Sequence, residues 1–101
     1  MITLLICYTL DMHKLKDFKA YARRWPEPIR RCAGDLRGYF LPTKLAGPAG
    51  SALALIDFPD LASYERYRQV RVRDPEALAN VAAADTARRI LVEDRSFLQR
   101  V

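Results

Sequence analysis

His13 is the one histidine of the chain and the residue type best suited to move a proton. It lies where an apolar run gives way to a helical pattern, so the positive end of the helix dipole would keep its imidazole neutral. A neutral imidazole can act as a general base near pH 7. A lone ionisable group is more often a solvated surface residue. Two interpretations therefore stay open: a catalytic base, or an exposed histidine in a first helical turn.

Three tyrosines and one arginine are candidates for binding a small molecule. Tyr8 and Tyr39 fall in strand-like segments and Tyr64 in a helical one, and their hydroxyls could orient a ligand at the edge of a pocket between sheet and helices. The alternative is that they are core residues with satisfied hydroxyls. Arg95, inside a strand-like segment, could bind an acidic ligand or pair with Glu93 or with Asp57.

Several other kinds of chemistry lack the residues they need. One histidine and two distant cysteines, Cys7 and Cys32, cannot supply a Zn or Fe–S ligand set, so we expect no metal. The glycines fit neither the Rossmann nor the Walker spacing, so we expect no cofactor. The two cysteines are too few for a disulfide scaffold, and we predict that both are buried thiols.

Length and charge define a small single domain. The chain has 101 residues, half of them apolar, which is enough for one hydrophobic core over residues 1–101. Its net charge of +5 is scattered without a block of like charges, so we expect no nucleic-acid partner. No apolar run approaches the ~20 residues of a membrane span, and no signal-peptide pattern is present. We therefore expect no membrane partner and a cytoplasmic protein.

Periodicity predicts four strands and three helical regions. β-branched and aromatic runs indicate strands over residues 2–10, 36–41, 52–58 and 90–98. Spacings of three and four indicate helices over 15–32, 61–70 and 76–89. The loop joining the second and third strands covers 43–50.

Local signals mark the ends of the predicted helices. Pro26 and Pro28 should break the first helix, and Gly34 is a candidate left-handed stop after it. Asp60 and Asp74 are typical caps of the two helices that follow. The inner side of the helix after Asp60 is predicted to consist of four spaced residues, Leu61, Tyr64, Tyr67 and Val70.

This order of elements predicts an α+β fold with a ferredoxin-like split β-α-β arrangement, one extra helix and a four-stranded antiparallel sheet. Right-handed crossovers place the first and third strands in the centre of the sheet. The helices can cover only one face. The other face would expose an apolar patch of about 350 Å² around Leu5 and Cys7, so we predict a homodimer joined through sheet faces by a two-fold axis.

An ordered set of residues along the chain resembles the NIPSNAP family of the dimeric α/β-barrel superfamily. The set comprises Ile2-Thr3, Arg31-Cys32, Gly34, Gly38-Tyr39-Phe40-Leu41-Pro42, Phe58, Tyr64, Glu65, Tyr67, Arg68, Asp74-Pro75, Arg95 and Phe97-Leu98. The resemblance covers nearly the whole chain. It implies ferredoxin-like domains that pair through their sheets, and it implies no single activity.

Two functional hypotheses follow. The first is a small homodimeric NIPSNAP-type domain that binds a small ligand or a protein partner. The second, by analogy with the superfamily, is a cofactor-independent monooxygenase or isomerase acting on a small aromatic or polyketide-like compound, with His13 as base and a tyrosine as donor. A cavity of ~300 Å³ or more reached by His13 would favour the enzyme.

Overall fold

The computed structural model describes residues 1–43, 50–87 and 90–101. Their helices and strands are, in order, β1 (Ile2–Leu10), the short 3₁₀ turn η1 (Met12–Lys14), α1 (Leu15–Arg24), α2 (Pro26–Arg31), β2 (Asp35–Phe40), β3 (Ser51–Phe58), α3 (Leu61–Arg71), α4 (Pro75–Ala87) and β4 (Ile90–Leu98). Each predicted strand is confirmed to within one residue at either end. Most of the predicted loop over 43–50 and the predicted helix end at 88–89 lie outside the described residues.

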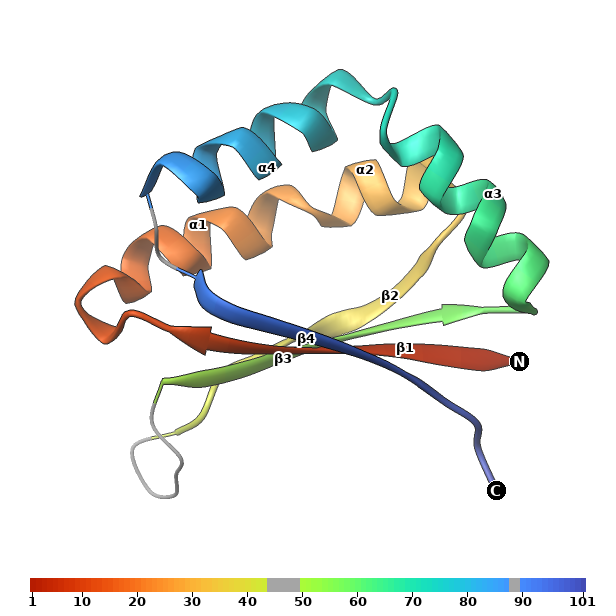
Figure 1. Cartoon of the computed structure of the whole chain (residues 1–101), viewed down its shortest axis with the longest axis horizontal. Coiled ribbons are helices and arrows are strands. Elements are labelled where there is room, and N and C mark those ends of the chain that lie inside the picture. Colours follow the sequence, from red (N-terminus) through yellow and green to blue (C-terminus); the bar gives the residue numbers. More distant parts are fainter. Residues whose placement is uncertain (44–49, 88–89) are drawn as a thin grey trace.

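The fold has two layers, with the helices on one face of the sheet only (Figure 1). The sheet order is β2-β3-β1-β4 and all neighbouring strands are antiparallel. The smallest dimension of the chain is 19 Å, as expected for one sheet and one layer of helices. The α+β split β-α-β prediction is therefore confirmed, including the central position of the first and third strands.

Alternation along β1 divides its side chains between the two faces. Leu4, Ile6 and Tyr8 point toward the helices and are buried, while Leu5 and Cys7 point to the other face. Cys7 is exposed in the single chain, so the prediction that both cysteines are buried is wrong for Cys7. The reason is its register: it faces the side of the sheet that carries no helix.

The first helical region breaks where its prolines predict. α1 ends at Arg24, and α2 begins with Pro26 in its first turn, where a missing amide hydrogen leaves no bond unmade. One buried stripe nevertheless runs through both helices and consists of Phe18, Tyr21, Trp25, Ile29 and Cys32.

α3 contacts the sheet through a narrower stripe than its sequence predicts. The Asp60 carboxylate caps it by accepting from the Ser63 amide, and Tyr64 and Tyr67 are buried against Phe58, with ring centroids 5.3 and 5.0 Å away. Leu61 and Val70 are exposed, so their predicted inward position is wrong. At about 100° per residue they lie a quarter turn to either side of the tyrosine stripe.

Asp74 ties the start of α4 to α2. Its Oδ1 accepts from the amides of Glu76 at 3.0 Å and Ala77 at 3.1 Å, and its carboxylate receives the Arg31 guanidinium at 3.0 Å. The Ala77 amide and then the Arg31 charge hold the pKa of Asp74 below its usual range. The predicted cap is thus confirmed, and the same carboxylate also anchors α4 to a neighbouring helix.

The turn after α2 corrects the predicted left-handed stop. Ala33, at φ 70°, adopts the left-handed conformation, one residue before the expected Gly34. Gly34 is instead required by a close approach: a Cβ there would lie 2.8 Å from Ile29 Cγ2 and 3.2 Å from a Tyr67 ring carbon. Its small size lets the chain pass beneath α2 and α3.

We expect Gly34→Ala to destabilise the protein and Ala33→Gly to stabilise it. Overpacking a tight core costs about 1–3 kcal/mol, which exceeds the roughly 0.4–1 kcal/mol that alanine gains through the unfolded chain. At position 33, glycine removes a left-handed penalty of roughly 1–2 kcal/mol. Urea unfolding of the two variants should give free-energy changes of opposite sign, and changes of equal sign would contradict this assignment.

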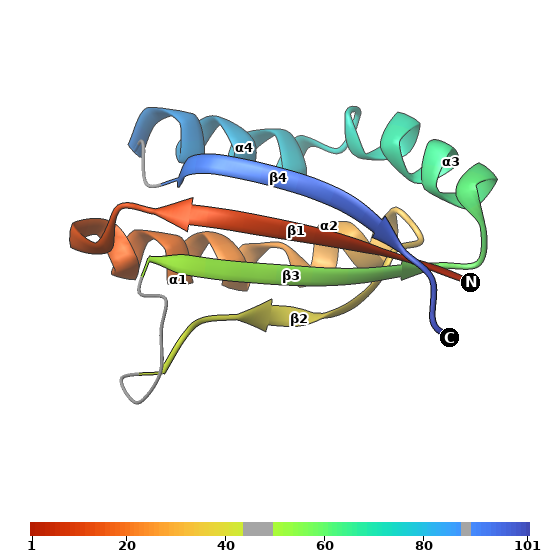
Figure 2. The same ribbon diagram turned by 60° about the horizontal axis from the view of Figure 1, so that its bottom comes forward.

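The face without helices is apolar in its centre and polar at one end. Leu5, Leu53 and Leu55 lie there half-buried on the two central strands. Asp57, on the same face, accepts hydrogen bonds from the Thr3 hydroxyl and, at 2.6 Å, from Arg37 Nε. Figure 2 shows this side of the sheet without a covering helix.

Candidate functional site

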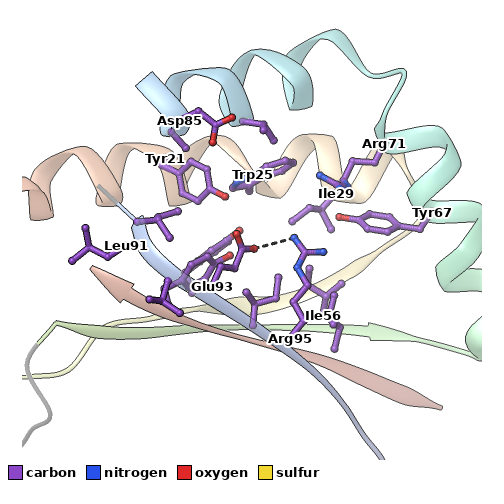
Figure 3. A pocket seen from close by; sticks show the side chains of 18 residues that line it. Tyr21, Trp25, Ile29, Ile56, Tyr67, Arg71, Asp85, Leu91, Glu93 and Arg95 are labelled. Atoms are coloured by element: carbon purple, nitrogen blue, oxygen red, sulfur yellow. Dashed lines mark hydrogen bonds and ion pairs between the residues drawn. The ribbon is translucent and has the colours of Figure 1, made fainter. Parts of the chain in front are cut away.

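A cavity of about 580 Å³ lies between the inner face of the sheet and the helices (Figure 3). Its floor includes Leu4 and Ile6 of β1 and Ile56 of β3, and its roof includes Trp25 and Ile29 of the first helical region. These five side chains are all buried, so most of the wall is apolar and held by the core.

The cavity exists because α4 has small side chains and does not cover the edge strand β4. Val81 and Ala84 are the apolar groups that α4 contributes to the lining. The exposed lining residues mark where the cavity reaches solvent, and they are Asp85 on α4 and Leu91, Val92, Glu93 and Arg95 on β4. A ligand would therefore enter between α4 and β4.

Two charged side chains of β4 face the cavity. Register pairs Tyr8 with Glu93 and Ile6 with Arg95, so both charges lie on the inner face of the strand. Arg95 Nη2 donates to Glu93 Oε1 at 2.9 Å. Burial acts to lower the pKa of Arg95, but its interactions with Glu93 and Tyr64 together outweigh this and leave the pKa raised. Arg95 is thus a permanent cation beside an otherwise apolar floor.

Tyrosine side chains form a second polar group in the cavity. Tyr8 stacks on Tyr39 with ring centroids 6.1 Å apart, and Tyr21 meets Tyr39 edge-on at 6.5 Å. Burial is the largest factor raising the pKa of all three hydroxyls. They therefore stay protonated at neutral pH and can donate hydrogen bonds to a ligand.

Trp25 brings a donor and a flat ring to the same space. The residue is 4% exposed, and its Nε1 has no hydrogen-bond partner among the described residues. The Arg71 guanidinium lies over the indole ring, with Cζ 5.9 Å from the ring centroid.

Arg71 and Arg95 define a basic end of the cavity near Tyr67. Burial raises the pKa of Tyr67 to about 12, and the charges of Arg71 and Arg95 act in the opposite direction, since both guanidinium groups are close to the phenol. In Figure 3 Tyr67 and Arg71 lie at one end of the cavity, the Arg95 guanidinium lies between them and Glu93, and Asp85 and Leu91 lie at the other end. The polar groups are therefore separated along the cavity.

The structure brings three of the five predicted site residues together. Tyr8, Tyr39 and Arg95 line the cavity. Tyr64 and His13 are not among its lining residues. Tyr64 packs edge-on against Phe97 at 4.8 Å.

His13 and Arg95 each have a defined local environment. His13 is exposed in η1, and its backbone amide donates to the Asp11 carboxylate at 3.0 Å. Of the two partners considered for Arg95, the structure shows Glu93, because Arg95 lies on the inner face of the sheet and Asp57 on the uncovered face, where it binds Thr3 and Arg37.

Sequence reasoning missed four cavity residues as site residues: Tyr21, Trp25, Arg71 and Glu93. Two signals were available. Arg71 follows Tyr67 by four residues, so both side chains lie on the same face of a helix. Glu93 and Arg95 are two residues apart on a strand, so their two charges lie on the same face of the sheet. Among the described residues, no three His, Cys, Asp or Glu side chains are grouped closely enough to hold a metal ion.

Comparison with known proteins identifies the family. The NIPSNAP family model matches residues 3–101. The chain belongs to the NIPSNAP family. No curated protein matches it. Within the described ranges, no helix of this NIPSNAP domain is long and apolar enough to cross a membrane.

Solved structures show the same fold at low sequence identity. A NIPSNAP domain protein from Burkholderia xenovorans superposes with a TM-score of 0.84 at 17% identity, covering 100% of this chain and 95% of that one. A NIPSNAP family protein from Agrobacterium tumefaciens gives a TM-score of 0.83 at 17% identity, with 99% and 92% covered. An antibiotic biosynthesis monooxygenase gives 0.69 at 14% identity, with 100% and 99% covered. At these identities the likeness concerns the fold alone.

Proposed function

We propose that this NIPSNAP domain binds a small, mainly apolar molecule in the cavity between sheet and helices and does so as a homodimer. The observation that carries the proposal is the cavity itself: about 580 Å³, within the roughly 300–1,000 Å³ of ligand pockets. Its walls are largely buried aliphatic and aromatic side chains with a few placed donors. This is the usual composition of a small-molecule site.

Trp25 provides the test, because it is the only tryptophan of the chain and lies in the cavity. Titration with 1-octanol and with octanoate, which do not absorb where indole does, should change the fluorescence in a saturable way. Isothermal calorimetry should give the same dissociation constants. If neither compound produces a saturable signal in either measurement, the ligand-binding function is wrong.

The proposed dimer is supported by the uncovered face of the sheet. Leu5, Leu53 and Leu55 form its centre, and Phe40 and Leu98 at its flanks are 49% and 45% exposed. Pairing two such faces would remove both apolar surfaces from water. The cytoplasm remains the expected compartment, and the two free thiols fit a reducing environment.

A second candidate function is a cofactor-independent monooxygenase or isomerase acting on a small aromatic or polyketide-like compound. It is supported by the protonated tyrosines that share the cavity with the Glu93 carboxylate. Oxygen uptake with anthrone, compared with heat-denatured protein, tests the oxygenase form. Any uptake should persist in His13→Ala, because His13 lies outside the cavity lining, and its loss in that variant would restore His13 as the base.

A further inference from the structure

We propose that the ligand is an apolar monocarboxylate whose carboxylate binds between Tyr67, Arg71 and Arg95 at the basic end of the cavity. This inference rests on the proposed ligand-binding function and adds the chemical class of the ligand. It is carried by the placement of two guanidinium groups and one phenol at the end of a mostly apolar space.

Arg71 is held at the cavity by the same geometry that buries the tyrosines of α3. Residues 64, 67 and 71 are spaced by three and four, so they share one helix face. Tyr64 and Tyr67 fix that face against Phe58, and Arg71 consequently extends over the Trp25 ring rather than into solvent. No carboxylate among the described residues forms an ion pair with Arg71.

The charges at this end leave one positive charge uncompensated. Arg95 pairs with Glu93 at 2.9 Å, whereas the contact shown for the Arg71 guanidinium within the described residues is with the face of an indole ring and not with a carboxylate. Asp85 lines the opposite end and is exposed, so solvent screens its charge. One excess cation matches a carboxylate better than a dianion such as a phosphate monoester.

The donors present suit the acceptor-only chemistry of a carboxylate. Each guanidinium offers a planar fork that can bind two carboxylate oxygens. The Tyr67 hydroxyl keeps its proton at neutral pH and adds a third donor. Beyond this end, the floor and roof offer Leu4, Ile6 and Ile29 to an apolar body.

A matched pair of probes isolates the carboxylate. Octanoate and 1-octanol share a chain length and differ in charge, and Trp25 fluorescence and calorimetry report both. We expect octanoate to bind the wild-type protein about tenfold or more tightly than 1-octanol, as for one charge-assisted contact. Sodium chloride should weaken octanoate binding and leave 1-octanol binding unchanged or slightly stronger.

Arg71→Gln should remove most of this preference. The octanoate dissociation constant should rise about tenfold, with that of 1-octanol changed less than twofold, so that 1-octanol binding also shows that the variant is folded. Arg68→Gln, on an exposed part of the same helix, removes the same charge and should leave both constants unchanged.

The outcomes separate the two proposals. Equal affinity for octanoate and 1-octanol, or an equal octanoate loss in both arginine variants, would overturn the carboxylate site and leave ligand binding standing. Absence of binding by both probes would overturn both. Retained discrimination in Arg71→Gln would show that Arg71 does not hold the carboxylate.

Discussion

Leu55→Arg is expected to dissociate the proposed dimer into monomers. Leu55 lies near the middle of the uncovered face, opposite Leu5 on the neighbouring central strand. A two-fold axis would bury two such arginines in one interface, and each uncompensated buried charge costs several kcal/mol. The dimer dissociation constant should therefore rise by about 100-fold or more. Sedimentation equilibrium should show a mass that falls from twice 11.6 kDa toward 11.6 kDa.

Leu61→Arg is the matched control for this experiment. Leu61 is 58% exposed on α3, and α3 belongs to the helix layer on the other face of the sheet (Figure 1), so the same substitution there should leave the mass unchanged. A second readout is the rate at which the Cys7 thiol reacts with a thiol reagent. The proposed dimer would cover this thiol, so its reaction should be faster in Leu55→Arg. A wild-type protein that sediments as a monomer at micromolar concentration would contradict the dimer.

Ala84→Phe is expected to weaken the binding of both probes without unfolding the protein. Ala84 is 9% exposed and faces the cavity from α4, so the larger side chain would enter empty space rather than a packed core. Overpacking strain should thus stay below its usual cost of about 1–3 kcal/mol. The affinities for octanoate and 1-octanol should both fall at least about tenfold, because the phenylalanine ring would fill the space that the alkyl chain of each probe needs.

Ala82→Phe provides the comparison for this variant. Residue 82 is exposed on the same helix and does not line the cavity. The same substitution should therefore leave both affinities unchanged. Unimpaired binding by Ala84→Phe in Trp25 fluorescence and calorimetry would show that the probes bind elsewhere.

The fold could be predicted closely because its signals are local. β-branched runs mark the strands, Pro26 breaks the first helical region, and Asp60 and Asp74 cap the helices that follow. Burial of individual side chains was less predictable. Leu61 and Val70 are apolar and correctly spaced for a helix, but α3 contacts the sheet only along the line of Tyr64 and Tyr67.

The site could be predicted only in part, because it depends on distances between layers. Tyr8, Tyr39 and Arg95 follow from strand alternation once the covered face is known. The space above them depends on how far α4 lies from β4, and no local pattern encodes that separation. Trp25 has the spacing of a core residue, and only the assembled structure shows that its ring also forms a cavity wall.

The charges on the inner face of β4 also affect the tendency of the protein to aggregate through its exposed sheet edge. In the described part of the chain β4 pairs only with β1, so its outer backbone groups are open to strand addition by another molecule. Natural proteins commonly protect such edges with inward-pointing charges, because an added strand would bury them. Glu93 and Arg95 occupy that position. The pair that shapes the cavity would therefore also resist edge-to-edge aggregation.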